Sequence, residues 1–147
     1  MKGLLFLCVA NSARSQLAEG IARAYLPTEV KVWSAGSRPT RVRPEAIAVL
    51  KEIGIDISHH RSKAVGEIPA ADVDTVITLC AEEECPLFLG QAQRLNWEMP
   101  DPASTDPALR PQDLLARFRS AREALRARIE WLRTETGPGP HDEGAGR

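Results

Sequence analysis

A cysteine and an arginine separated by five residues are the groups of this sequence best suited to chemistry. Residues 8–15, which contain both, read Cys-Val-Ala-Asn-Ser-Ala-Arg-Ser. An apolar run precedes Cys8 and a helical pattern follows Ser15, so we expect a buried strand, a tight turn and a helix N-terminus. Unpaired N–H groups at such a turn bind tetrahedral oxyanions and stabilise a thiolate. The pattern predicts Cys8 as a nucleophile and Arg14 as a bidentate clamp on a bound anion.

Two side chains near this turn fit the same role. Ser15 can donate a hydrogen bond to the Cys8 sulfur and thereby favour its thiolate form. Asn11 tolerates the left-handed backbone angles that a tight loop without glycine needs. The residues that we expect to surround the anion are Val9, Ala10, Asn11, Ser12, Ala13 and Arg14. The same spacing also fits an inert cysteine buried at the end of a strand.

An aspartate far along the chain is a candidate proton donor. Asp101 stands before Pro102 in a Pro- and Asp-rich loop, residues 100–111, that follows a short expected strand. A carboxyl group there could act as general acid toward a departing oxygen. An Asp-Pro pair is also ordinary turn chemistry, so both interpretations stay open at this point.

Two further cysteines, Cys80 and Cys85, are separated by four residues. Cys80 ends an apolar strand that we expect beside the strand of Cys8, so their thiols could approach one another. A helix would hold the Cys80 and Cys85 Cα atoms too far apart for a disulfide, and Pro86 disfavours helix there. Two packing cysteines remain possible. A zinc site is a poor alternative, because it would need the adjacent residues His59 and His60.

The elements that must position these groups alternate along the chain. We expect strands at 2–8, 30–33, 72–79 and around 95–97, and helices at 15–25, from Pro44 to about Gly54, and at 112–134. The second strand should end at Ser34-Ala35-Gly36. Alternating strands and helices predict an α/β fold with a parallel sheet, whose ligands bind at the carboxyl ends of the strands. We expect one domain over residues 1–136 and a disordered tail over 137–147.

Composition excludes several classes of function. The net charge of −1 over 147 residues argues against a nucleic-acid or acidic-membrane partner, and we interpret the arginines at 38–43 as a solvated loop. No apolar run approaches the roughly 20 residues of a membrane span, and no export signal is evident. We therefore expect a cytoplasmic protein, in which three cysteines are catalytic or redox-active rather than a structural staple.

These residues together resemble a known family. The supporting segments are 8–16, Ala-Glu-Gly at 18–20, Ser-Ala-Gly at 34–36, Gly-Ile-Asp-Ile-Ser at 54–58, Val-Ile-Thr-Leu-Cys at 76–80, Cys-Pro at 85–86 and Pro-Asp-Pro-Ala at 100–103. The chain resembles a thioredoxin-coupled arsenate reductase of the low-molecular-weight protein tyrosine phosphatase superfamily. The resemblance implies a three-layer sandwich with a four-stranded parallel sheet flanked by helices. Tyrosine phosphatases of this fold carry aromatic residues where Ala103 and Ser104 stand here.

The resemblance implies a redox relay. Arsenate, for which phosphate or sulfate is a mimic, sits in the anion loop, Cys8 attacks arsenic, and Asp101 protonates the departing oxygen. Cys80 then attacks Cys8 and releases arsenite, and Cys85 moves the disulfide outward. A thioredoxin, a glutaredoxin or a small thiol reduces that disulfide, with thioredoxin favoured. We expect a monomer with no bound cofactor.

The chain departs from the family at three places. Ala13 replaces a second loop cysteine, and the spacing between Cys80 and Cys85 is short. Some members bind potassium through side chains that match Asn11, Glu19 and Ser34. Other ligands in those members fall near Arg61 and Lys63, and a fixed cation there would displace an ion. The resemblance therefore implies a weak or absent potassium site.

Two other functions remain in competition. A phosphomonoester phosphatase would need Cys8, Arg14 and Asp101 for a phosphocysteine intermediate, but neither Cys80 nor Cys85. A non-catalytic oxyanion-binding or redox-sensing module would bind the anion without consuming a reductant. The dependence of turnover on Cys80 separates the first from a reductase, and consumption of reductant separates the second.

Overall fold

The computed structural model describes residues 1–81, 86, 88, 90–104 and 106–136. Its centre is a parallel sheet of four strands in the order β2-β1-β3-β4. The strands are β1 (Gly3–Cys8), β2 (Lys31–Gly36), β3 (Thr75–Thr78) and β4 (Gln93–Asn96). The helices are α1 (Arg14–Tyr25), α2 (Pro44–Lys51) and α3 (Pro111–Thr136), with short 3-10 helices at Val65–Glu67 and Ala70–Asp72. The predicted α/β class and four-stranded parallel sheet are confirmed.

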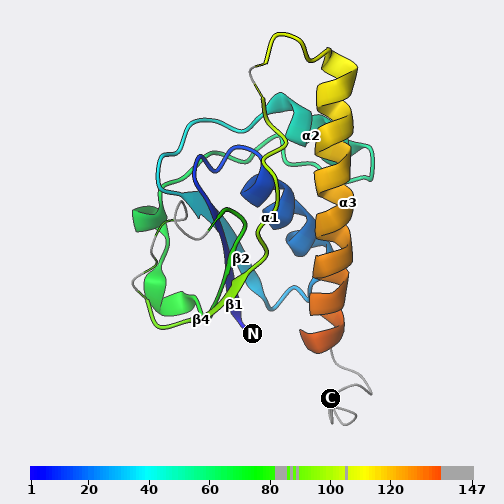
Figure 1. Ribbon diagram of the computed structural model, residues 1–147. Helices are drawn as coiled ribbons and strands as arrows, with labels where there is room; N and C mark the ends of the chain where they lie inside the picture. Colours follow the sequence, from blue (N-terminus) through cyan, green and yellow to red (C-terminus); the bar gives the residue numbers. More distant parts are fainter. Residues whose placement is uncertain (82–85, 87, 89, 105, 137–147) are drawn as a thin grey trace.

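Alternating side chains of β1 divide the core between the two faces of the sheet. Leu4 and Phe6 pack with residues of the three α-helices, whereas Leu5 and Leu7 pack toward the segment with the 3-10 helices. All four side chains are fully buried, as expected for the central strand of a parallel sheet. Figure 1 shows α3 running the length of the molecule beside α1 and α2. The carboxyl ends of the strands point away from the labelled N-terminus. The loop between β1 and α1, residues 9–13, which we call the anion loop, lies at the carboxyl ends.

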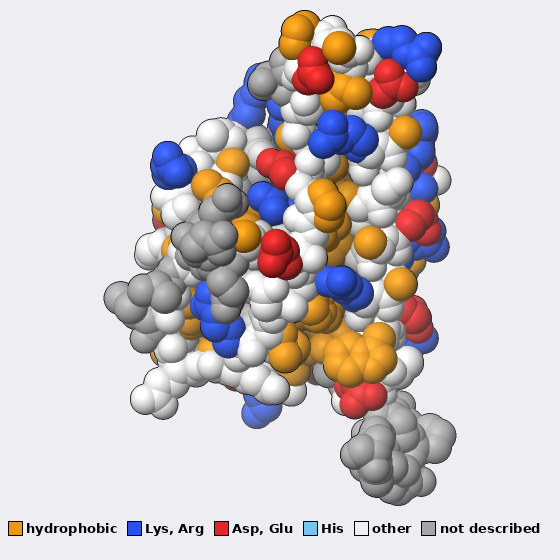
Figure 2. All heavy atoms as spheres, in the orientation of Figure 1, with side chains coloured by type: hydrophobic (Ala, Val, Ile, Leu, Met, Phe, Trp, Pro, Cys, Tyr) orange, Lys and Arg blue, Asp and Glu red, His pale blue; other side chains and the backbone are white. Residues whose placement is uncertain are grey.

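An ion-pair cluster near the surface links helix α3 to the residue that follows α2. Glu52, just after α2, accepts hydrogen bonds from Arg119 and Arg122, both at 2.7 Å for their shortest contact. These hydrogen bonds lower the pKa of Glu52 to about 2. Figure 2 shows acidic and basic side chains interspersed along the side of the molecule that α3 occupies. Exposed pairs of this kind contribute little to stability individually, so the apolar face of α3 provides most of the attachment.

Three expected boundaries were wrong. β2 continues through Ser34–Gly36 rather than ending before it, because Ser34, Ala35 and Gly36 pair with the end of β1. β3 begins at Thr75 instead of residue 72, because residues 70–72 form a 3-10 helix. The fourth strand is shifted to Gln93–Asn96, and Trp97 lies just beyond it, with its ring centroid 6.3 Å from that of Phe6. Gly54 has a φ of 81°, which confirms the turn expected after the second helix. The expected tail, residues 137–147, lies outside the described residues.

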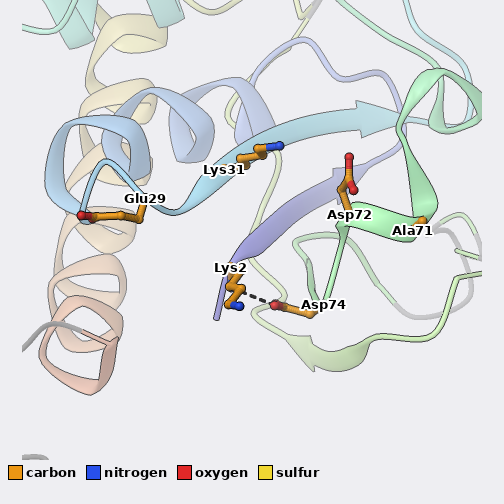
Figure 3. A pocket seen from close by; sticks show the side chains of 6 residues that line it. All are labelled: Lys2, Glu29, Lys31, Ala71, Asp72 and Asp74. Carbon is orange, nitrogen blue, oxygen red and sulfur yellow. Dashed lines mark hydrogen bonds between the residues drawn. The ribbon is translucent and has the colours of Figure 1, made fainter.

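The amino end of the sheet carries a charged hollow, which Figure 3 shows from close by. Its lining residues are Lys2, Glu29, Lys31, Ala71, Asp72 and Asp74. The Lys2 backbone N–H donates a hydrogen bond of 2.8 Å to Asp74 Oδ2. Because lysines and carboxylates are mixed here, the hollow has no single sign of charge with which to select an anion.

None of the described helices combines the length and the apolar character needed to cross a membrane.

Candidate active site

The loop between β1 and α1 forms a small hollow. Its volume is about 140 Å³, and its lining residues are Cys8, Val9, Ala10, Ser12, Ala13, Arg14 and Asp101. Asn11 is the only non-glycine residue with a positive φ, 49°, among the described residues, which confirms the left-handed turn expected there. Arg14 opens α1, so the hollow lies over a helix N-terminus. The left-handed turn, the hollow and the helix N-terminus are the local structure that the sequence predicts, and binding of an oxyanion there stays a prediction.

The segment 38–43 holds this loop from outside. The backbone N–H groups of Arg38, Thr40 and Arg43 donate to the carbonyl oxygens of Val9, Ala10 and Ser12 at 2.9, 3.2 and 2.9 Å. Because these carbonyls are bonded on the outer side, the loop can turn its N–H groups toward an anion. The interpretation of this segment as merely a solvated loop was incomplete: its side chains at 38 and 41 are exposed, but its backbone supports the loop.

A glycine allows β2 to approach the same loop. A Cβ atom on Gly36 would lie 2.4 Å from the carbonyl oxygen of Val9 and 2.9 Å from the backbone nitrogen of Asn11. Real Cβ atoms do not approach backbone this closely, so any larger residue at position 36 would have to displace the anion loop.

The predicted nucleophile, Cys8, lies within hydrogen-bond distance of Ser15. Cys8 is a free cysteine with 2% of its surface exposed, and its Sγ lies 2.8 Å from Ser15 Oγ. Asn11 Nδ2 donates to the same Ser15 oxygen at 2.7 Å. Since that oxygen accepts from Asn11, the hydroxyl hydrogen of Ser15 can be donated to the sulfur. The contact expected between Ser15 and the Cys8 sulfur is therefore present.

The arginine at the loop is held in a fixed orientation. Arg14 Nη1 donates to the carbonyl oxygens of Leu79 and Met99 at 3.3 and 3.1 Å. Its Nη2 lies 3.8 Å from Oδ2 of Asp101, whose side chain is half exposed at the mouth of the hollow. Asp101 Oδ1 meanwhile accepts the Ala103 N–H at 3.0 Å. The structure thus brings Asp101 and Arg14 together beside Cys8, and gives the aspartate access to solvent as a proton donor requires.

Replacing Arg14 by lysine is expected to weaken binding of inorganic phosphate about thirtyfold, as measured by titration calorimetry. Lysine keeps the charge but loses the planar fork and one of the two carbonyl contacts that orient it. The exposed arginine Arg110, which pairs with Asp113 at the start of α3, provides a control in the variant Arg110→Lys, with unchanged affinity expected. A loss below threefold in Arg14→Lys would show that the guanidinium does not clamp the anion.

The second cysteine follows the strand next to that of Cys8. β3 pairs with β1, and the Leu79 N–H donates to the Leu7 carbonyl at 2.9 Å. The segments that follow these two strands therefore leave the sheet side by side. This adjacency was expected from the sequence. Cys80 is fully buried and disulfide-bonded, whereas Cys8 is free, so the two are not joined to each other in this state. Cys85 lies outside the described residues.

Beneath the loop lies the buried carboxylate of Glu19, for which the resemblance implied only a role as a potassium ligand. Glu19 Oε1 accepts from Ser34 Oγ at 2.5 Å and lies 3.5 Å from Lys63 Nζ, while its Oε2 accepts from Arg23 at 2.9 Å. Asn11 Oδ1 accepts the Lys63 backbone N–H at 2.8 Å. The candidate ligand atoms of Asn11, Glu19 and Ser34 are thus engaged with one another and with fixed cations. These residues do not fit a potassium ion.

Two further residues of this network were not predicted from the sequence. Gln16 Nε2 donates to Asn11 Oδ1 at 3.0 Å, and His60 Nδ1 contacts Gln16 Oε1 at 3.0 Å. Burial lowers the pKa of His60, so its imidazole is neutral at pH 7. Gln16 and Glu19 are polar residues within an otherwise apolar stretch of α1, and this departure from the apolar pattern was a usable signal.

The sheet order, the left-handed loop and the thiol facing a helix N-terminus define a class of α/β enzymes that bind a tetrahedral oxyanion and attack it with cysteine. The model of the low molecular weight phosphotyrosine protein phosphatase family matches residues 3–136. The chain belongs to this family.

Relatives within the family are similar over nearly their whole length. An arsenate reductase of Halalkalibacterium halodurans is 38% identical over 138 residues, which cover 92% of this chain and 97% of that protein. A solved arsenate reductase in its phosphate-binding state superposes with a TM-score of 0.75 at 35% identity, over 92% of this chain and 98% of that one. A thioredoxin-dependent arsenate reductase of Corynebacterium glutamicum has a TM-score of 0.59 at 27% identity, over 90% of this chain and 63% of the other.

Proposed function

We propose that this protein is an arsenate reductase that reduces arsenate to arsenite through Cys8, Cys80 and Cys85. The observation that carries the proposal is the placement of Cys8 and Cys80 at the ends of the neighbouring strands β1 and β3. A hydrolase has no need of a second thiol there. The arsenate reductases to which the chain is similar give independent support.

The first step uses groups already in contact. Arsenate binds to the N–H groups of the loop and to Arg14, and the Cys8 thiolate attacks arsenic to form a sulfur–arsenic bond. An arsenate oxygen leaves as water, with a proton supplied by Asp101 at the mouth of the hollow. The Ser15 hydroxyl stabilises the thiolate before attack. Phosphate has the same shape and charge as arsenate. The same site should therefore also hydrolyse phosphomonoesters slowly, through a phosphocysteine intermediate.

The second step is the reduction. The Cys80 thiol attacks the Cys8 sulfur, a disulfide forms, the sulfur–arsenic bond breaks, and its electron pair remains on arsenic. Arsenic is thereby reduced by two electrons and the two thiols are oxidised. Cys85 then attacks Cys80, which frees Cys8 as a thiol and leaves a Cys80–Cys85 disulfide.

An external dithiol closes the cycle. We propose thioredoxin, acting on a cytoplasmic, monomeric enzyme, because thiol–disulfide exchange with a dithiol releases both enzyme thiols in one encounter. The similarity to a thioredoxin-dependent arsenate reductase supports this choice over glutaredoxin or a small thiol.

The direct test is arsenate-dependent oxidation of NADPH by the purified protein with thioredoxin and thioredoxin reductase. We expect turnover that saturates with arsenate and that stops when thioredoxin is omitted. Replacement of thioredoxin by glutaredoxin and glutathione distinguishes the reductants. Hydrolysis of p-nitrophenyl phosphate without arsenate-dependent NADPH oxidation in either system would identify the protein as a phosphatase instead. Binding of phosphate with neither activity would leave only an oxyanion-binding module.

A further inference from the structure

The buried carboxylate of Glu19 and the Cys8 sulfur are the two ends of one hydrogen-bonded chain. Ser34 Oγ donates to Glu19 Oε1 at 2.5 Å, and Asn11 Nδ2 donates to Ser34 Oγ at 2.9 Å. The same Asn11 nitrogen donates to Ser15 Oγ at 2.7 Å, and Ser15 lies 2.8 Å from Cys8. Except for Cys8 and Glu19, at 2% and 3%, every member of this chain is fully buried.

Three of the four hydrogen bonds in this chain have a defined direction. Asn11 uses both amide hydrogens, one on Ser34 and one on Ser15. Ser34 donates its own hydrogen to the Glu19 carboxylate, so its oxygen accepts from Asn11. The Ser15 oxygen likewise accepts from Asn11, and the same hydroxyl lies within hydrogen-bond distance of the Cys8 sulfur. The contact between Ser15 and Cys8 therefore depends on the orientation of Asn11 and on the Glu19 carboxylate at the other end of the chain.

Lys63 contacts both Glu19 and Asn11. Its Nζ lies 3.5 Å from Glu19 Oε1, with only 14% of its side chain exposed, and its backbone N–H donates to Asn11 Oδ1. Arg23 contacts the other carboxylate oxygen, but half of its side chain is exposed and solvent screens its charge. His60 Nε2 lies 4.0 Å from Glu19 Oε2 and is neutral at pH 7 because burial lowers its pKa. Lys63 is thus the cation paired with Glu19 that is the better shielded from solvent, since Arg23 is half exposed.

We propose that Lys63 is a positioning residue for the nucleophile, a cation of the protein itself placed against Glu19, one of the residues for which the resemblance implies a potassium site. Its ammonium pairs with Glu19 and its backbone N–H holds Asn11, so Lys63 orients the hydrogen-bond chain that runs through Ser34, Asn11 and Ser15 toward Cys8. The inference rests on the proposed role of Cys8, but it concerns the thiolate alone and requires neither arsenate nor a reductant.

The test measures alkylation of Cys8 by iodoacetamide at pH 6 to 8, in a Cys80→Ser/Cys85→Ser background where Cys8 is the only thiol. In Lys63→Met we expect alkylation about three- to tenfold slower at the lower pH, because less of Cys8 is thiolate. Lys63→Arg, which keeps the charge, should alkylate within about twofold of the parent. The rates of the Cys80→Ser/Cys85→Ser parent should be equal in potassium chloride and in tetramethylammonium chloride of the same ionic strength.

The matched control is Lys31→Met, which removes an exposed lysine at the amino end of β2, in the hollow of Figure 3. Its alkylation rate should equal that of the parent. If Lys63→Met does not fold, as judged by thermal unfolding, Lys63→Gln takes its place with the same expectation. Parental rates in a folded Lys63→Met or Lys63→Gln, or faster alkylation of the parent in potassium, would overturn the proposal. Either result would leave arsenate reduction by Cys8 untouched.

Discussion

Replacing Cys8 by serine is expected to lower kcat for arsenate reduction at least about a thousandfold. A serine hydroxyl is not ionised at neutral pH. It also cannot form a disulfide with Cys80, the step in which arsenic receives its two electrons. The stabilising contact from Ser15, at 2.8 Å from the sulfur, would then act on a neutral hydroxyl with little nucleophilic character. The measurement is arsenite formed per enzyme in the thioredoxin-coupled assay.

The same variant supplies its own control, because in the proposed mechanism the anion is bound by the backbone N–H groups of the loop and by Arg14. Cys8→Ser should therefore still bind inorganic phosphate with an affinity within about threefold of wild type. Phosphate binding with no arsenite separates loss of chemistry from loss of the loop. Arsenite formation above a tenth of the wild-type rate would mean that another group attacks arsenic.

Replacing Cys80 by serine is expected to abolish multiple-turnover arsenate reduction, again by at least about a thousandfold, while leaving phosphate ester hydrolysis within about twofold. The thiol–arsenate adduct would form on Cys8, but no second sulfur would follow to take Cys8 into a disulfide. Hydrolysis of p-nitrophenyl phosphate needs only Cys8, Arg14 and Asp101, which line one hollow. Both rates are measured on the same preparation.

Cys85→Ser is the informative comparison for Cys80→Ser. It should release one arsenite per enzyme and then stop with Cys8 and Cys80 joined, whereas Cys80→Ser should release none. Undiminished steady-state reduction in Cys80→Ser would remove the relay from the mechanism. Equal loss of ester hydrolysis and arsenate reduction would instead indicate damage to the fold, since Cys80 is fully buried.

The anion loop was predictable because its determinants are local. Cys8 and Arg14 are close in sequence, Asn11 takes the left-handed angles expected of it, and Ser15 reaches the sulfur as predicted. The alternation of strands and helices also gave the order of elements. Parallel pairing then placed Cys8 and Cys80 at one edge of the sheet, which follows from general rules for α/β folds.

The parts that were not predicted depend on contacts between distant segments. Nothing in the sequence near residues 38–43 indicates that their N–H groups bond to the anion loop, because that requires the position of β2 against β1. The pairing of Glu19 with Lys63 joins residues on α1 and on a later loop. The predicted end of β2 was too early for the same reason, namely a contact between distant segments. A glycine at position 36 suggests a turn, and only the structure shows that it allows a close approach to Val9.

The central claim is that the electrons for arsenate come from the enzyme's own thiols, and a single-turnover thiol count tests it most directly. The protein is first reduced with excess dithiol and freed of it, mixed with arsenate without any reductant, quenched with an alkylating agent and weighed by mass spectrometry. We predict one arsenite per enzyme and a change from three alkylated cysteines to one, matching the three cysteines of the chain. Three alkylated cysteines after exposure to arsenate, with no arsenite formed, would contradict the account.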